Sequence, residues 1–342
     1  MGTLVEANTE FAVDLCKILI KENPNKNVFY SPLSISAASG MVLLGAKGDT
    51  AKQMEKTLHF DKITGSGSSA SSPAAGAQCD KPGGPHPQFK ELLAAINQHT
   101  KNYALSIANR LYGEQRYEFH QKYLHCTKEM YGADLERVDF QHALEATRKK
   151  INSWVESQTN GKIKDLLASG SIDVSVVLVL VNAIYFKGKW KREFKKTDTK
   201  EKPFWISQVA KDLTYAKLQQ WTCSSNMKKQ EIKVFLPKFK LEEKYILKEI
   251  LAGLGMVDVF SPGKANLTGM ANGPLVVSKV IHQAYVEVNE EGTEAAGATG
   301  VTVVPVSANI LPEFKADHPF MFFIRHNKTQ SVLFFGKVVS PE

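Results

Sequence analysis

The sequence predicts an α+β fold organised around one large mixed sheet. Helix-like and strand-like segments follow one another in irregular order, which favours a mixed fold with a large sheet. The longest apolar run, residues 174–181, is rich in valine and has the length of a strand buried on both faces. The chain has 342 residues, of which 43% are hydrophobic and 23% charged, enough for a substantial core. No apolar run is long enough to span a membrane.

Helices are predicted where apolar residues recur at helical spacing. The first covers residues 5–21 and ends before Asn23, in a segment that stops a helix. The second begins after Ser31, whose hydroxyl can cap it, and has Pro32 in its first turn. Further helices are expected over residues 89–98, 121–131 and 142–159.

Strands are predicted from alternation of apolar and polar residues and from runs of β-branched residues. Residues 284–289 show the alternation, and residues 174–186 contain the continuous apolar run. Shorter strands are expected to begin at Asn27 and to cover residues 104–112 and 133–140. The sheet would therefore collect strands from distant parts of the chain.

Residues 65–85 form a low-complexity insertion of small residues, glycine and proline, which cannot bury a core. We interpret it as a disordered loop between helices. A passive insertion is the simpler interpretation, and an interaction site is the alternative.

The N-terminal segment and the cysteines indicate a reducing compartment. The first ten residues lack the basic segment and the cleavage site of a signal peptide. The four cysteines lack the spacing of metal or redox motifs, so we expect free thiols and neither a metal nor a cofactor. We predict a cytoplasmic protein that also reaches the outside of the cell by signal-independent release. The cysteines are Cys16, Cys79, Cys126 and Cys223.

The chain is basic, with a net charge of +8, and its lysines cluster loosely over residues 187–202. A basic face is compatible with weak polyanion binding. Arginine interleaved with aromatic residues is missing, however, so ordinary solubilising charge is the simpler interpretation.

Residues 287–307 combine the composition of a loop with the pattern of a strand. Small residues dominate from Gly292 to Gly300, and such a stretch forms strands poorly, so composition alone favours a flexible linker. At a period of two, however, one face carries only small and β-branched residues, while Glu294 falls on the other face. The residues on the first face are Thr293, Ala295, Gly297, Thr299, Val301 and Val303.

Several segments resemble the serpin family. The resemblance runs from Met1 to Glu342 and is nearest to the intracellular, ovalbumin-like branch, clade B. It implies a single monomeric serpin domain over residues 1–342, with a large main sheet, smaller sheets and an exposed reactive-centre loop. The segments that carry it are residues 27–34 and 45–54, residues 152–167, the central strand at 180–190, a strand at 230–241, a helix and turn at 246–260, the hinge at 290–299, and a closing hairpin at 314–325 and 331–338.

The resemblance implies that residues 290–313 are a reactive-centre loop offered to a serine protease. The reactive bond would join Val306 to Ser307, and a small branched residue such as Val306 suits an elastase-like pocket. After attack and cleavage, the loop would insert into the main sheet while the protease stays covalently attached. Val303, Val304 and Pro305 would contact the protease, and the hinge would comprise Glu290, Glu291, Gly292, Thr293, Glu294, Ala295, Ala296, Gly297, Ala298 and Thr299.

The resemblance also implies a polar cluster beneath the large sheet that governs whether its central strands part. Its members would be Ser31, Ser34, Asn182 and His282. Their hydroxyl, amide and imidazole groups can satisfy one another, and a satisfied buried network orders a core. A triad of His282 with Ser278 and Asp258 lacks the context of a nucleophile, so no catalytic residue and no enzyme activity are predicted.

One departure from the family pattern affects the smaller sheet. After residue 206 the family continues through several strands, and this chain is shorter there by roughly fifty residues, about three strands. The closing hairpin would then present unpaired edges and apolar surface to water. The alternative to an inhibitor is therefore an internally deleted, non-inhibitory serpin isoform that acts as a substrate or a binding protein.

Overall fold

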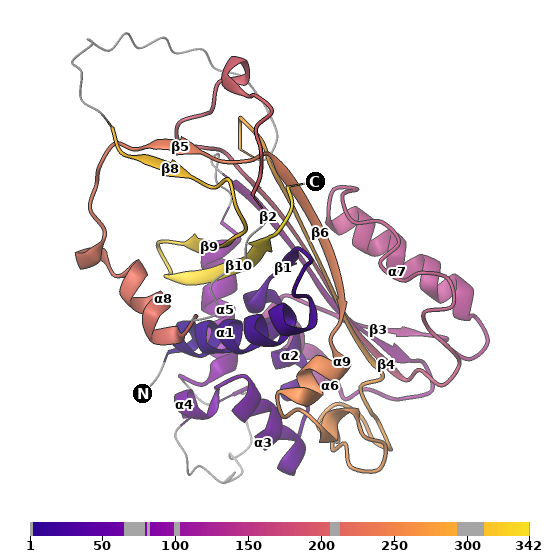
Figure 1. The fold of residues 1–342 in the computed structure, drawn as a ribbon. Coiled ribbons are helices and arrows are strands. Elements are labelled where there is room, and N and C mark those ends of the chain that lie inside the picture. Colours follow the sequence, from indigo (N-terminus) through magenta and orange to yellow (C-terminus); the bar gives the residue numbers. More distant parts are fainter. Residues whose placement is uncertain are drawn as a thin grey trace.

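The computed structural model describes residues 3–64, 79–80, 83–98, 103–205, 213–292 and 311–341 (Figure 1). The helices in these residues are α1 (Leu4–Glu22), α2 (Pro32–Leu43), α3 (Gly48–Thr57), α4 (Asp61–Thr64), α5 (Pro85–Ile96), α6 (Gln121–Tyr131), α7 (Leu144–Gln158), α8 (Tyr215–Thr222) and α9 (Lys248–Gly253), with short 3-10 helices η1 (Lys196–Asp198), η2 (Ser224–Asn226) and η3 (Asp258–Phe260). The strands are β1 (Val28–Tyr30), β2 (Tyr103–Glu114), β3 (Leu135–Val138), β4 (Leu178–Gly188), β5 (Lys233–Phe235), β6 (Phe239–Ile246), β7 (Lys279–Val288), β8 (Glu313–Lys315), β9 (Phe320–His326) and β10 (Ser331–Val338). In the described ranges, no helix combines the length and apolarity that crossing a membrane requires.

The largest sheet has five strands in the order β3-β2-β4-β7-β6. β2 pairs antiparallel with β4, and β6 pairs antiparallel with β7. The two central strands, β4 and β7, run parallel and pair from Val179 with Lys279 to Tyr185 with Tyr285. We call this pairing the central seam. A strand entering the seam in the opposite direction would be antiparallel to both neighbours, the geometry in which ladder hydrogen bonds are perpendicular to the strands.

Both faces of β4 are buried, as the valine-rich run predicts. On one face Val179 packs in a core that includes Ile151 and Val155 of α7. On the other face Leu178 and Leu180 belong to the larger core, which includes residues of α1 and α2. Figure 1 shows the same layering, with α7 on one side of the sheet and α1 and α2 on the other. The central seam is therefore covered by helices on both sides.

β4 begins later than the predicted strand over residues 174–186. Val174 is 59% exposed, and the Asp173 carboxylate accepts a hydrogen bond from the Ser175 N–H (2.8 Å), which holds this segment in a turn. The prediction was wrong for residues 174–177 because a local side-chain turn outweighs their strand preference. Two segments that resemble single family strands are each divided in the structure. Residues 230–241 contribute to β5 and β6, and residues 314–325 contribute to β8 and β9.

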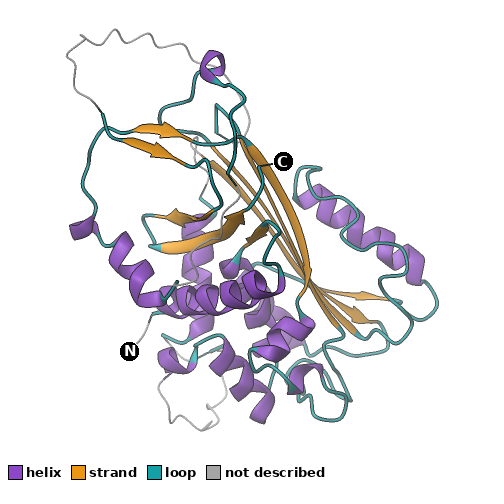
Figure 2. Ribbon diagram, viewed as in Figure 1, coloured by secondary structure: helices purple, strands orange, loops and turns teal. Residues whose placement is uncertain are grey.

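Among the described residues, the smaller sheets are short and have edges without a partner strand. A three-stranded sheet has the order β1-β10-β9, and β5 pairs only with β8 among the described strands (Figure 2). Every residue of β9 is only half-buried, and Phe235 of β5 and Phe314 of β8 are 41% and 55% exposed. Open strand edges and exposed aromatic rings are what the sequence predicts for a chain whose second sheet is incomplete.

Two of the four cysteines form a disulfide, so the prediction of four free thiols was wrong. Cys79 bonds to Cys126 of α6, with a Cα–Cα distance of 5.3 Å, while Cys16 and Cys223 are free. The two bonded residues are 47 positions apart, and no spacing rule pairs them. Only the packing of the chain beside α6 brings them within bonding distance.

Candidate functional site

The chain reverses direction directly after β7, at the start of the predicted hinge. The Asn289 N–H donates to the Gly292 carbonyl (3.0 Å), and the Gly292 N–H donates to the Asn289 carbonyl (3.3 Å). Gly292 has a φ of +111°, a conformation that favours glycine. A Cβ on Gly292 would lie 2.2 Å from the Gly188 carbonyl oxygen, so no other residue fits this position without displacing the backbone.

Gly292 lies at the mouth of the central seam. It forms one antiparallel bridge with Lys189, the residue after β4, and another with Asn289, the residue after β7. At Gly292 the chain therefore has the direction and the neighbours of a strand that lies between β4 and β7. The remaining hinge residues, from Thr293 to Thr299, lie outside the described residues.

The segment that follows β4 holds the reversal through the backbone. The Phe194 N–H donates to the Glu290 carbonyl (2.8 Å), and the Trp190 N–H donates to the Glu291 carbonyl (3.3 Å). The Trp190 indole N–H also donates to the Asn289 carbonyl (2.9 Å). These contacts come from residues that the sequence analysis assigned no role, although Trp190 stands at the end of the central strand.

Both glutamates of the hinge have partners in the structure. The buried Glu290 carboxylate accepts a hydrogen bond from the Thr199 hydroxyl (2.7 Å) and pairs with Lys238 (3.2 Å). Glu291 pairs with Lys196 (2.6 Å). The Thr199 hydroxyl, with a smaller contribution from Lys238, holds the pKa of Glu290 below its usual value. The carboxylate is therefore charged at neutral pH and ties the hinge to two separate segments.

We expect Glu290→Ala to lower the free energy of unfolding by about 2 kcal/mol, because it removes a buried carboxylate that accepts a hydrogen bond and pairs with a lysine. Urea denaturation measures this loss. Glu313→Ala is the matched control, since Glu313 pairs with Lys315 at 2.7 Å in an exposed position. Such surface pairs contribute roughly 0.5 kcal/mol or less. Equal losses in the two variants would show that Glu290 is an ordinary surface charge.

A row of polar side chains crosses the middle of the sheet beneath the central seam. Asn109 of β2 is the register partner of Asn182 of β4, and Asn182 is the register partner of His282 of β7. The Asn182 amide nitrogen donates to the Asn109 carbonyl oxygen, and His282 Nδ1 bonds to the Asn182 carbonyl oxygen. The row therefore links the two central strands through side chains as well as through the backbone.

The start of α2 completes this polar cluster. The Ser31 N–H donates to His282 Nε2 (3.1 Å), and the Asn182 amide donates to the Ser34 hydroxyl (2.5 Å). The Ser31 hydroxyl caps α2 by accepting from the Ser34 N–H (3.2 Å) and donates to the Leu333 carbonyl of β10 (2.6 Å). All four residues that the resemblance brought together are in contact here.

Asn109 belongs to the cluster, and the sequence analysis missed it. A signal was available, because Asn109 lies between Ile107 and Leu111 on one face of a predicted strand, and both neighbours on that face are apolar. A polar residue on an otherwise apolar face needs a hydrogen-bond partner when it is buried.

His282 is neutral in this environment. Its imidazole is fully buried and stacks on the Tyr245 ring, with a centroid distance of 6.4 Å. Burial lowers the pKa of His282 to about 3. Nε2 accepts the Ser31 N–H, so the ring proton resides on Nδ1, and a second proton on Nε2 would face that N–H. Protonation is therefore incompatible with the network as it stands.

The proposed protease contacts Val303, Val304 and Pro305 and the reactive bond between Val306 and Ser307 lie outside the described residues. The structure resumes at residue 311, just before β8. The described part of the site therefore consists of the reversal after β7, its anchors and the polar cluster.

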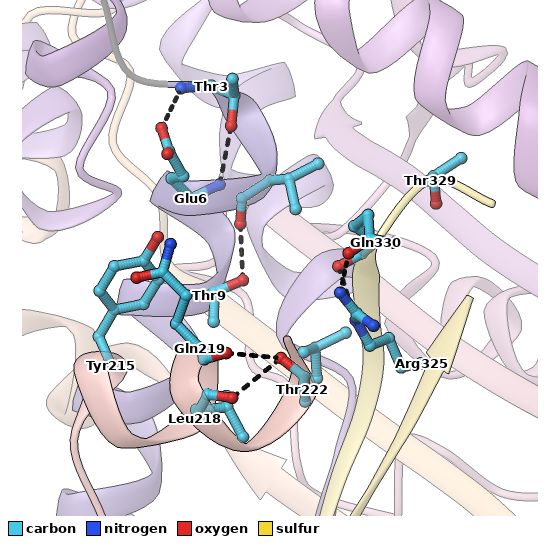
Figure 3. A pocket seen from close by; sticks show the side chains of 12 residues that line it. Thr3, Glu6, Thr9, Tyr215, Leu218, Gln219, Thr222, Arg325, Thr329 and Gln330 are labelled. Carbon is cyan, nitrogen blue, oxygen red and sulfur yellow. Dashed lines mark hydrogen bonds between the residues drawn. The ribbon is translucent and has the colours of Figure 1, made fainter. Parts of the chain in front are cut away.

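A separate cavity of about 370 Å³ lies between α1, α8 and the turn that joins β9 to β10. Figure 3 shows Tyr215 and Leu218 of α8 on one side and Arg325 and Gln330 on the other. The cavity shares no lining residue with the hinge or the polar cluster, so it is not part of the candidate site.

The chain matches the family model described as "Serpin (serine protease inhibitor)" over residues 6–211 and again over residues 206–341. The two matches meet at residues 206–211, where the sequence analysis expected a segment to be missing. The alignment with human serpin B3 runs over 397 positions against 342 residues in this chain, so at least 55 positions have no residue here. That difference agrees with the expected shortening of roughly fifty residues.

Individual relatives match along their full length. The chain is 44% identical to human serpin B3 and 40% identical to leukocyte elastase inhibitor A of Rattus norvegicus, and each alignment covers 100% of both chains. Among solved structures, uncleaved ovalbumin superposes with a TM-score of 0.84 at 36% identity, covering 99% of this chain and 100% of that one.

Proposed function

This chain belongs to the serpin family, and from that premise we propose that it traps elastase-like serine proteases by offering its own loop for cleavage. The protease attacks the carbonyl carbon of Val306, forms an acyl-enzyme and releases Ser307 as the new N-terminus. Residues 293–305 then enter the central seam as a new strand, and the attached protease is carried along and distorted.

The observation that supports this proposal most directly is the position of Gly292. It bridges Lys189 and Asn289 at the mouth of the seam, in the antiparallel direction that an inserted strand requires. Insertion therefore extends a pairing that has already begun. Because the loop face from Thr293 to Val303 carries only small and β-branched residues, it suits a position between two covered strands.

The polar cluster is the barrier to insertion in this mechanism. Insertion separates Asn182 from His282, which are register partners across the seam. Their side-chain bond and the contacts with Ser31 and Ser34 must then rearrange. The cluster thus keeps the seam closed until a cleaved loop supplies ladder hydrogen bonds in exchange.

The target class follows from the residue that enters the primary pocket of the protease. Val306 is small and branched, which suits a shallow pocket and not one built for arginine or phenylalanine. We further propose that the protein acts as a cytoplasmic monomer, is also released without a signal, and binds polyanions at most weakly. Its partner is then the protease itself.

A second candidate function has its own supporting observation. The open edges of β5 and β9 and the exposed rings of Phe235 and Phe314 mark an incomplete smaller sheet. A serpin domain with an incomplete sheet would be less stable, and the acyl-enzyme would be hydrolysed and the protease released before insertion is complete. The protein would then be a substrate or a binding protein and not an inhibitor.

Denaturing gels separate the two functions. Mixed with neutrophil-type elastase, an inhibitor gives an SDS-stable band near the summed mass of the two proteins. The variant Val306→Arg should lose that band with elastase and form the corresponding band with trypsin, because the primary pocket of trypsin selects basic residues. Clean cleavage without any stable band, in both pairings, would establish the substrate function instead.

A further inference from the structure

The end of the 65–85 insertion is tied to α6 at a group of chemically reactive side chains. Cys79, the first described residue after the gap at 65–78, bonds to Cys126 of α6. His125 precedes Cys126, and Glu129 lies one helical turn after His125 on the same face. Cys79, His125 and Glu129 place their sulfur, nitrogen and oxygen atoms within 4.8 Å of one another.

The spacing of these atoms matches the coordination shell of zinc. His125 Nε2 lies 3.4 Å from Glu129 Oε2, and Cys79 Sγ lies 3.5 Å from the same oxygen. In tetrahedral zinc with bonds of about 2.0 Å to nitrogen or oxygen and about 2.3 Å to sulfur, neighbouring ligands lie about 3.3–3.5 Å apart. The distances from Glu129 Oε2 to His125 Nε2 and to Cys79 Sγ therefore match two edges of such a tetrahedron.

A lysine orients the carboxylate of this group. Lys90 of α5 pairs with Oε1 of Glu129 (2.9 Å), while Oε2 faces Cys79 and His125. The carboxylate thus presents one oxygen to the other two side chains, which is the arrangement that outer hydrogen-bond partners give to metal ligands.

We propose that reduction of the disulfide converts this group into a zinc site formed by Cys79, His125 and Glu129, with Cys126 as the thiol that reduction releases. Reduction breaks the Sγ–Sγ bond and adds two electrons and two protons, while a phosphine reductant becomes its oxide or two small thiols become a disulfide. Zinc then replaces the thiol proton of Cys79, which passes to solvent. A thiolate and an imidazole favour zinc over calcium or magnesium, which take oxygen ligands.

The site would keep residue 79 attached to α6 in either redox state. In an oxidising compartment the disulfide makes the connection, and in a reducing compartment the metal makes it. Only the reduced, metal-free protein would lose the connection between α6 and the 65–85 insertion. This inference does not depend on the proposed inhibition, because none of the four residues belongs to the hinge or the polar cluster.

The test uses the full chain carrying Cys223→Ser, which removes the exposed free thiol. Cys16 does not interfere, because burial raises the pKa of its thiol to about 12. After phosphine reduction and removal of metals, Co²⁺ should bind with a stoichiometry of one and show a thiolate charge-transfer band and the visible bands of tetrahedral cobalt. Zn²⁺ should displace it, and the oxidised protein should show neither band.

Variants assign the ligands. His125→Ala should weaken Zn²⁺ binding by at least about tenfold, and Lys90→Met by about tenfold. His142→Ala, which removes an imidazole that is also exposed but lies two residues before α7, should leave binding unchanged. Absence of the charge-transfer band in the reduced parent protein, or equal Zn²⁺ affinity in the parent and His125→Ala, would overturn the proposal. The spectrum of the parent decides the question even where a variant fails to fold.

Discussion

Cleavage of the bond between Val306 and Ser307 is expected to raise the midpoint of thermal unfolding by roughly 15 °C. Insertion of residues 293–305 adds about a dozen ladder hydrogen bonds, each worth about 1 kcal/mol net, and buries Val301 and Val303, for a gain on the order of 10 kcal/mol. For a chain of this length, each kcal/mol shifts the midpoint by about 1.4 °C. Calorimetry before and after cleavage by elastase measures the rise.

Two arginine variants test whether the gain comes from insertion. Thr299→Arg places a charge on the face that would be buried, so cleavage of this variant should leave the midpoint within about 2 °C of the uncleaved protein. Ala298→Arg places the same charge on the opposite face, which also carries Glu294, and should keep most of the rise. If the parent protein shows no rise after complete cleavage, the sheet does not accept the loop and the substrate function holds.

Acidification from about pH 7.5 to about pH 5 is expected to cost about 2 kcal/mol of stability through His282 alone. The usual histidine pKa is 6.5, and burial lowers that of His282 to about 3. Between these values the unfolded chain binds a proton that the folded protein does not, so stability falls as the pH falls. The full loss, on the order of 5 kcal/mol, is reached only below about pH 3, where the folded protein also binds the proton.

The variant His282→Asn isolates this contribution because it cannot titrate. Urea denaturation at several pH values should show a slope that is smaller than that of the parent by up to about 1.4 kcal/mol per pH unit between pH 6.5 and 5. His86, whose pKa burial lowers to about 4, titrates in both proteins and cancels in the comparison. Identical slopes would mean that the polar cluster admits a protonated imidazole.

The alternation of small and charged residues in the hinge stays a prediction, because Thr293 to Thr299 lie outside the described residues. It depends only on the period of an extended chain. The buried character of β4 was predictable for the same reason. The start of β4 was not, because the Asp173 turn competes locally with strand formation at residues of high strand preference.

The polar cluster was predictable only in part. Ser31 was identified as a helix cap from its own neighbours, but its contact with His282 joins residues 251 positions apart. Asn109 enters the cluster because the pairing of β2 with β4 sets it opposite Asn182. No local pattern contains that register. The sequence can show that Asn109 needs a hydrogen-bond partner, but only the pairing of the strands shows that this partner is Asn182.

What the sequence determined by itself is most of the longer helices, the buried character of the central strand and the alternating pattern of the loop, and the resemblance added the missing stretch after residue 206. These depend on periodicity, on local turn chemistry and on the length between recognisable segments. Only the tertiary structure decided that Gly292 bridges both central strands, that Glu290 is held by Thr199 and Lys238, and that Cys79 meets Cys126. Each of these contacts joins segments whose relative position is set by sheet register and helix packing, which the whole chain establishes together.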